Sequence, residues 1–372
     1  MSVGKSGDNR ARQILVIGNL GYVGPWVIHH LRQAHQTARL IGLDSNWFSP
    51  EKIGVDYRPS FDPDHQIYGD VRDWRDHLTL DAYDTIIYLA AVSNDQIANQ
   101  FKSATHNINA ISAAEIAKKF WEIEAKEREK LFIYASSCSL YGKTDSHLPC
   151  KETDPIHPRT DYARSKNQAE DALKQIATES TKKHRLVSLR FATACGVSFN
   201  QRTDLILNDF VSRAVRRNQI EVFSDRTPLR PLIDVEDMGR VVSAMTKAKH
   251  ASPFSTYNVG TNGNNYSVLD LANIVAQTLN KPNIVEIKNC NGGDDRSYKV
   301  DFSKLNAYLK AEKINVPFKS VETTIHQLFK LYSHPKYIAW ESTSEIRLAS
   351  LQKYILREMM DQNLRWIKDD KK

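Results

Sequence analysis

The sequence predicts an α/β protein built on a doubly wound parallel sheet, with a smaller, mainly C-terminal α/β part. Three observations support this prediction. Strand-like and helix-like segments alternate through roughly the first 195 residues, as expected for parallel strands joined by helical crossovers. A glycine-rich turn follows the first apolar strand. The alternation then breaks down after Gly196, where a second structural unit should begin.

The first strand, turn and helix predict a dinucleotide site. Residues 14–17 form a short apolar run that ends at Gly18, and apolar residues at helical spacing begin after Gly24. Gly18 permits a tight turn, Gly21 lets a pyrophosphate approach the backbone, and Gly24 lets helix and strand pack closely. The next strand, ARLIGLD, ends at Asp44, at the offset of an acid that binds the adenosine ribose. That carboxylate would repel a 2′-phosphate, which favours NAD over NADP.

The later strands of this half predict where the other ligand contacts lie. Four segments read as these strands: HQIYGDVRD, TIIYLAAVSND, LFIYASSCSLYG and HRLVSLRFATACG. In doubly wound sheets, ligands bind beyond the carboxyl ends of the strands. That rule selects residues that should meet at one crevice, namely Asp70 with Val71, Ala90 with Ala91, Ser137, and Thr193.

Tyr162 and Lys166 lie four residues apart in the segment DYARSKNQAEDAL, which reads as a helix. Positions i and i+4 share one helix face, so the ammonium can lie beneath the phenol. A free tyrosine has a pKa near 10. A fixed cation nearby favours the phenolate, which makes the tyrosine a usable proton acceptor. The pair alone is a common pattern, and its weight comes from the glycine loop upstream.

The predicted domain division follows from this pattern. Residues 1–196 should form an NAD-binding domain of the Rossmann type, with a returning segment at about 232–260. Residues 197–231 and 261–372 should form the substrate-binding part and a C-terminal helical extension. For that extension, the helical spacing of apolar residues favours a packing or dimer role.

Composition narrows the classes of function. The net charge of +7 suits an anionic substrate, but Lys and Arg are scattered, so we expect no nucleic-acid partner. No run of about 18 apolar residues occurs, and the polar start lacks a secretory signal, so we expect no membrane partner. The four cysteines show no metal-ligand spacing. We therefore expect a reduced cytoplasmic chain without a metal site.

The chain resembles the extended short-chain dehydrogenase/reductases, specifically the NAD-dependent nucleotide-sugar epimerase/dehydratase group that includes UDP-glucose 4-epimerase. The matching pieces occur in the family's order over roughly residues 13 to 305: GNLGYVG, GDVRD, YLAA, SSCSLYG, YARSK, LRFATACG, RPLIDVEDMGR, YNVG and DDRSYKVDFSKL. The resemblance implies NAD as cofactor. We also expect the protein to form a homodimer. The resemblance also implies NAD contacts for single residues, namely Gly18, Gly21, Gly24, Asp44, Asp70, Val71, Ala90 and Ala91.

The same resemblance implies the catalytic and substrate residues. Ser137 matches the catalytic serine, Tyr162 the catalytic base, and Lys166 the lysine that also holds the nicotinamide ribose. Asn107 matches an asparagine that usually supports the site. On the substrate side, the implied contacts to a nucleoside-diphosphate sugar are Ser137, Thr193, which matches a position flanking the sugar, and Asn208, near the family's substrate-binding helix. Arg230 and Arg296 match arginines that usually hold the diphosphate, since an arginine fork binds phosphate bidentately.

The expected activity is NAD-dependent modification of the sugar through a keto intermediate, as a 4-epimerase or C4 oxidoreductase. The alternative is a sugar dehydratase, or a non-catalytic NAD-binding regulator on the same fold. The 4,6-dehydratases of this group usually carry Asp-Glu after the catalytic serine or threonine, whereas Cys138 and Ser139 stand here. That departure disfavours dehydration. Asp234 is a second departure, because it occupies a position where histidine is common.

Overall fold

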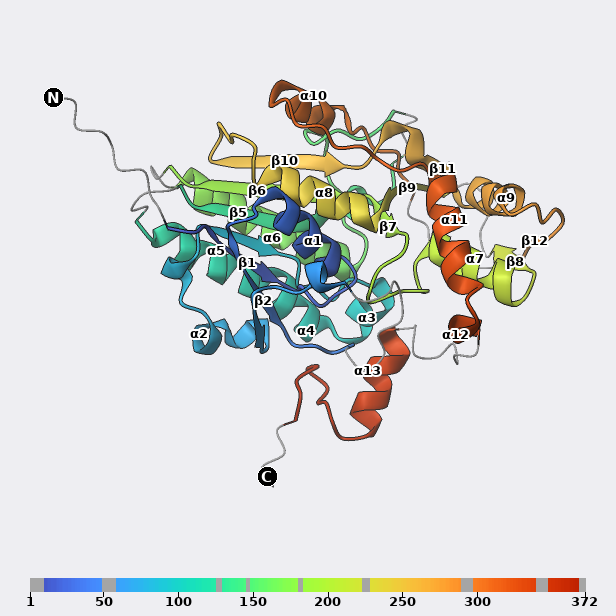
Figure 1. Ribbon diagram of the computed structural model, residues 1–372, viewed down its shortest axis with the longest axis horizontal. Helices are drawn as coiled ribbons and strands as arrows, with labels where there is room; N and C mark the ends of the chain where they lie inside the picture. The colour runs from blue at the N-terminus through green and yellow to red at the C-terminus, as the bar shows by residue number, and fades with distance from the viewer. Residues whose placement is uncertain are drawn as a thin grey trace.

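Seven strands form one parallel sheet in the order β10-β6-β5-β4-β1-β2-β3, at the centre of the molecule (Figure 1). The computed structural model describes residues 10–48, 58–124, 129–144, 148–179, 183–222, 228–288, 297–338 and 347–367. The strands are β1 (Gln13–Ile17), β2 (Arg39–Asp44), β3 (His65–Tyr68), β4 (Thr85–Tyr88), β5 (Leu131–Ser137), β6 (Arg185–Phe191) and β10 (Phe254–Val259). Every pair in this sheet is parallel, and the first six strands have the Rossmann order. The predicted fold class is therefore confirmed.

Helices cover both faces of the sheet because successive strand residues point to opposite sides. The helices of this half are α1 (Gly24–Ala34), α2 (Trp74–His77), α3 (Asp95–Gln100), α4 (Lys102–His106), α5 (Ser112–Glu122), α6 (Asp161–Thr178) and α8 (Val235–Met245). Ile14 and Val16 pack with α1 and α8, whereas Leu15 and Ile17 pack with α5 and α6. Short 3-10 turns are η2 (Pro59–Phe61), η3 (Val71–Asp73), η4 (Leu80–Ala82), η6 (Cys138–Tyr141) and η7 (Asn262–Asn264), and η5 (Asn107–Ile111) is π-helical.

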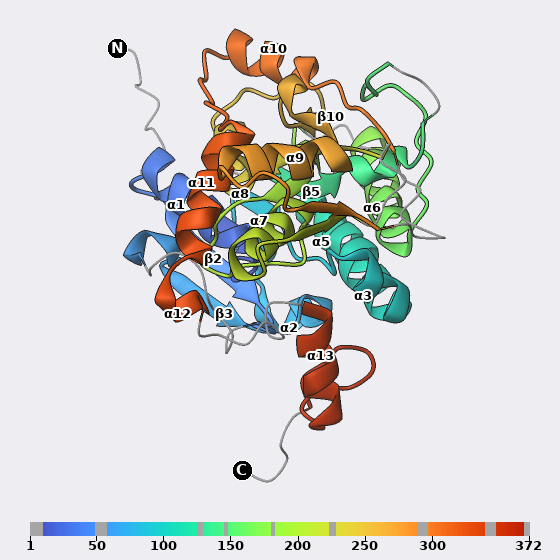
Figure 2. The same ribbon diagram turned by 90° about the vertical axis from the view of Figure 1, so that its right-hand side faces the viewer.

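The second unit lies beyond one end of the sheet, where α7, α9 and α11 gather (Figures 1 and 2). Its strands are β7 (Thr193–Cys195), β8 (Ile220–Val222), β9 (Leu229–Asp234), β11 (Asn265–Ser267) and β12 (Val285–Ile287). They form a three-stranded sheet, β11-β9-β7, and a two-stranded sheet, β12-β8. Its helices are α7 (Ile206–Arg216), α9 (Val268–Thr278), α11 (Val321–Tyr332) and α12 (Pro335–Ile338). Buried side chains such as Leu207, Leu271 and Leu328 form its own core.

Two C-terminal segments pack on the Rossmann layers, although the predicted division groups them with the substrate-binding part. Leu305 and Leu309 of α10 (Ser303–Ala311) share a core cluster with β1. Leu351 and Tyr354 of α13 (Arg347–Leu356) join the cluster on the opposite face. Helix α13 lies away from the other C-terminal helices in both views (Figures 1 and 2). No helix in the described part of the chain is long and apolar enough to span a membrane.

Candidate active site

A cavity of about 1020 Å³ opens at the carboxyl ends of the central strands. It lies where the strand order reverses between β1 and β4, the usual ligand position in this architecture. Most predicted site residues line it, namely Gly18, Gly21, Asp44, Asp70, Val71, Ala90, Ala91, Ser137, Tyr162, Lys166, Thr193 and Arg230. Gly24 and Asn208 are not among the lining residues, and Arg296 lies outside the described residues.

Steric crowding explains why the first and third positions of the glycine loop, Gly18 and Gly24, are glycine. Gly18 has φ +89°, and a Cβ on it would lie 2.5 Å from the backbone nitrogen of Ala90. A Cβ on Gly24 would lie 2.1 Å from the backbone oxygen of Asn19. Helix α1 starts without a side-chain cap, so its first N–H groups can receive an anion. The loop therefore fits a pyrophosphate.

Asp44 joins the end of β2 to the glycine loop. Its carboxylate accepts hydrogen bonds from the backbone N–H of Leu20 at 2.9 Å and of Asn46 at 2.8 Å. Both contacts hold the side chain at the cavity wall, where the sequence predicts an acid for the adenosine ribose.

Ser137, Tyr162 and Lys166 meet in this cavity from two elements. Ser137 ends β5, and its hydroxyl accepts a hydrogen bond from the backbone N–H of Ser139 at 3.1 Å. Tyr162 and Lys166 occupy successive turns of α6, and the Lys166 Nζ lies 5.9 Å from the centre of the Tyr162 ring. That Nζ donates to the Ala135 carbonyl at 2.7 Å. Burial lowers the pKa of Lys166 to about 7, and Glu170 opposes this effect.

A buried ion pair supports the helix beneath these residues. Glu170, one turn beyond Lys166, accepts two hydrogen bonds from Arg190 Nε at 3.1 Å and one from Nη2 at 2.7 Å. The hydroxyl of Ser188 donates to the same carboxylate at 2.8 Å. Sequence reasoning missed this pair, because the partners come from α6 and β6 and carry no local signature.

Asn109, rather than Asn107, makes the contacts that connect α6 to the loop after β4. Its amide donates to Ser165 at 3.0 Å and to the Val92 carbonyl at 3.1 Å, and its oxygen accepts from the Val92 N–H at 2.8 Å. Asn109 is fully buried, whereas Asn107 is half-buried. Both lie in the π-helical turn, whose wider spacing is difficult to anticipate from sequence.

The two residues after Ser137 have different environments. Cys138 is fully buried, its thiol donates to the Arg190 carbonyl at 3.0 Å, and burial raises its pKa far above the ordinary value. Ser139 lines the cavity, and its hydroxyl has no hydrogen-bond partner among the described residues. Cys138 is therefore a packed residue, as the sequence favours. Neither side chain is a carboxylic acid.

Several arginines line the cavity. Arg230 does so together with Arg213, Arg216 and Arg217 from the end of α7. Thr193 also lines the cavity. Sequence reasoning treated Lys and Arg as scattered, although the spacing of Arg213, Arg216 and Arg217 on one helix was an available signal.

Asn208 is placed inside the protein rather than at the cavity surface. It is fully buried, and its oxygen accepts the N–H of Gly196 at 2.9 Å. Its amide donates to the carbonyl of Arg202 at 2.7 Å and to the hydroxyl of Tyr22 at 3.1 Å. These contacts satisfy backbone groups of the loop after β7, the structural alternative to a substrate contact.

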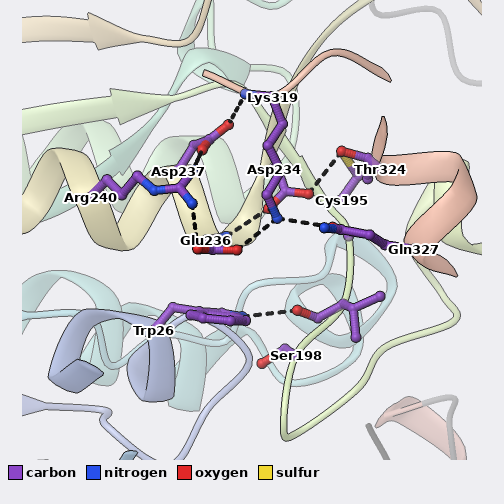
Figure 3. Close-up of polar contacts among 12 residues, drawn as sticks. Trp26, Cys195, Ser198, Asp234, Glu236, Asp237, Arg240, Lys319, Thr324 and Gln327 are labelled. Carbon is purple, nitrogen blue, oxygen red and sulfur yellow. Dashed lines mark hydrogen bonds and ion pairs between the residues drawn. The ribbon is translucent and has the colours of Figure 1, made fainter. Parts of the chain in front are cut away.

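Asp234 links the two halves of the molecule (Figure 3). It caps α8 by accepting the N–H of Glu236 at 2.9 Å, and it accepts the hydroxyl of Thr324 in α11 at 2.8 Å. Lys319 reaches Asp234 at 3.2 Å and Glu236 at 2.7 Å. An aspartate here thus attaches α11 to the Rossmann layers through a salt-bridge network, which accounts for this departure from the common histidine.

The fold and this cleft define a dinucleotide-binding α/β protein of the extended short-chain dehydrogenase/reductase type. Residues 14–260 match the NAD dependent epimerase/dehydratase family. The chain belongs to this family and is an NAD-dependent enzyme of its type. The glycine cradle, the uncapped start of α1 and Asp44 all fit that cofactor.

Individual relatives are distant. UDP-arabinose 4-epimerase 1 of Arabidopsis thaliana is 26% identical over 74% of this chain and 68% of its own length. UDP-glucuronic acid decarboxylase 1 of the same plant is 25% identical over 50% of this chain and only 43% of its own length. UDP-glucuronic acid 4-epimerase from Bacillus cereus, solved with UDP-glucuronic acid and NAD, has a TM-score of 0.68 at 18% identity. That comparison covers 86% of this chain and 98% of the epimerase, and it shows a shared fold.

Proposed function

We propose that the protein oxidises C4 of a nucleoside-diphosphate sugar to a keto sugar, as a 4-epimerase or a C4 oxidoreductase. The observation that supports this most directly is the convergence of Ser137, Tyr162 and Lys166 on the cavity that also contains the glycine loop. The epimerases among the relatives act on substrates of this class by name.

The roles follow from the chemistry of these side chains. Bound NAD supplies the hydride acceptor. Tyr162 takes the proton of the C4 hydroxyl, and the Lys166 ammonium on the next turn favours the phenolate form. Ser137 donates a hydrogen bond to the same sugar oxygen, which aligns it and stabilises the charge that develops as the carbonyl forms.

The arginines of the cavity suit the diphosphate of the substrate. Arg213, Arg216 and Arg230 line the same cavity as the glycine loop and Tyr162. Arginine binds phosphate bidentately, so these side chains are the candidates to hold a diphosphate there.

Two alternatives are less well supported. A 4,6-dehydratase needs an acid and a base beside C5 and C6, but the side chain of Cys138 is in the core and Ser139 is a weak acid. A non-catalytic regulator would not require Ser137, Tyr162 and Lys166 to meet in one cavity.

A panel of UDP-, GDP-, CDP- and dTDP-sugars tests the proposal. NADH absorbance reports net oxidation, and product NMR separates epimerisation from elimination. Elimination products from every reactive sugar would contradict the proposed outcome. If no sugar reacts or binds, the regulator hypothesis replaces the enzyme hypothesis.

Tyr162→Phe tests the mechanism with the substrate found in that panel. We expect turnover to fall by about 1000-fold or more while NAD still binds, because the variant loses only the proton acceptor. Tyr68→Phe is the matched control, because Tyr68 is exposed on β3 and does not line the cavity. Undiminished turnover in Tyr162→Phe would exclude the tyrosine as base.

A further inference from the structure

The C-terminal clasp, which we define as residues 347–367, packs beside the loop that follows Asp44. The indole Nε1 of Trp366 donates to the carbonyl of Ser45 at 2.7 Å. Arg72, which follows β3, donates to the carbonyl of Leu364 at 3.1 Å. Residues 45–48 also line the cavity. The C-terminal clasp therefore contacts the loop that forms the cavity wall next to Asp44, which we call the cofactor end.

One side chain of the clasp enters the cavity. Arg347 is the first residue of α13, lines the cavity and is only 9% exposed. Its guanidinium lies over the ring of Phe48, 4.2 Å from the ring centre. Its Nη2 is buried and has no hydrogen-bond partner among the described residues.

Arg202, a neighbour of Arg347, differs from it because its guanidinium donates hydrogen bonds to nearby side chains. Arg202 donates to Asp204 through Nε at 2.8 Å and Nη2 at 2.7 Å, and to Ser93 through Nη1 at 3.0 Å. Asp204 also accepts from Asn94 at 2.8 Å. The carboxylate of Asp204, which acts on Arg347 electrostatically, is therefore already engaged.

The position of Arg347 is costly without an anion. A buried cation needs a compensating partner, and a cation at a helix N-terminus also opposes the helix dipole. Burial lowers the pKa of Arg347 to about 9, and the nearby charge of Arg202 adds to the effect. An anionic ligand in the cavity would offset both costs.

The surroundings indicate which anion. Besides Arg202 and Asp204, the charged or titratable groups that act on Arg347 are Asp44 and Tyr22, both at the cofactor end. Tyr22 belongs to the glycine loop, whose helix N-terminus fits a pyrophosphate. A 2′-phosphate is disfavoured by Asp44. For the diphosphate of the substrate, the cavity offers other arginines, namely Arg213, Arg216 and Arg230.

We propose that Arg347 of the C-terminal clasp binds the pyrophosphate of the dinucleotide, opposite the N–H groups of the glycine loop. The two halves of this site come from the two ends of the described chain. The proposal needs only that the protein binds NAD, the cofactor of its family, and it is independent of which sugar is the substrate.

The test is calorimetric titration of nucleotide-free protein with NAD, ADP, adenosine and UDP. Arg347→Met keeps an apolar stem over Phe48 and removes the charge. We expect the Kd for NAD and for ADP to rise about 10- to 100-fold, and that for adenosine to change less than about twofold. UDP binding should be unchanged.

Lys353→Met is the matched control, since it removes one positive charge from an exposed position of the same helix. It should leave all four titrations unchanged. Thermal unfolding without nucleotide checks that Arg347→Met remains folded. An unchanged Kd for ADP, an equal loss for adenosine, or a loss confined to UDP would overturn the proposal. These titrations involve no turnover, so their failure leaves the proposed reaction standing, and failure of the sugar panel leaves this phosphate contact standing.

Discussion

Buried cations in two regions of the molecule differ in how they are paired. Beneath the cleft, Arg190 forms an ion pair with Glu170 at 2.7 Å. At the cleft surface, Lys166 donates to a carbonyl oxygen, and Arg347 has an unsatisfied Nη2 among the described residues. Both cleft groups have pKa values lowered by burial. In these three examples the carboxylate-paired cation supports the fold, whereas Lys166 and Arg347, which have no carboxylate hydrogen-bond partner among the described residues, line the cavity.

Glu170→Gln should have the largest effect on stability, because it leaves Arg190 buried without its counter-charge. We expect the free energy of unfolding to fall by about 3–5 kcal/mol, measured by urea denaturation. The double variant Glu170→Leu with Arg190→Met should recover much of the loss, since it removes both charges. A loss under about 1 kcal/mol in the single variant would contradict a structural role for the pair.

Lys166→Met should instead raise the free energy of unfolding. Lys166 is a buried ammonium whose hydrogen bond among the described residues goes to a carbonyl rather than to a carboxylate. Removing it should stabilise the nucleotide-free protein by about 1–2 kcal/mol at pH 7, while turnover is lost. The folded pKa of about 7 lies below the ordinary 10.5, so the unfolded chain binds more protons between these values. The advantage of the variant should therefore be full below pH 7 and shrink as the pH approaches 10.5. Urea denaturation at several pH values measures this trend, and an advantage that grows with pH would contradict it.

Two carboxylates in the salt-bridge network around Asp234 also differ in how they are paired, and a variant there should change the free energy of unfolding by a smaller amount. Contacts with His30 and Lys319, together with the charge of Arg240, lower the pKa of Glu236 to about 2, whereas burial raises the pKa of Asp237 to about 6. Folded Asp237 thus holds its proton to higher pH than the unfolded chain, so it reduces stability as the pH rises from about 4 to 6. As the pH rises through that window, the free energy of unfolding of Asp237→Asn should increase relative to that of the wild type, on the order of 1 kcal/mol. Differential scanning calorimetry from pH 4 to 7 checks the sign.

The parts of the fold that the sequence predicts are those with local causes. The alternation of short apolar runs and helical segments determines the parallel sheet. Gly18 and Gly24 are predictable because each faces a backbone that leaves no room for a Cβ. Ser137, Tyr162 and Lys166 could be identified because each stands at a strand end or on one helix face.

The parts that sequence reasoning missed depend on contacts between distant segments. Asn208 is adjacent to the cavity along the chain, but the loop after β7 uses its amide internally. Asn109 makes its contacts because a π-helical turn changes the spacing near Asn107. Arg347 reaches the glycine-loop end only because the last segments of the chain pack back on the first. No local pattern encodes such a return.

The contact of the C-terminal clasp with the loop after β2 has a consequence for kinetics. A dinucleotide held between the glycine loop and Arg347 would dissociate only as fast as that side chain withdraws. An epimerase regenerates its NAD in every cycle and benefits from a long residence time, whereas a net dehydrogenase must exchange the cofactor at each turnover. The off-rate of NAD is thus a measurement that distinguishes the two proposed outcomes of the same active site.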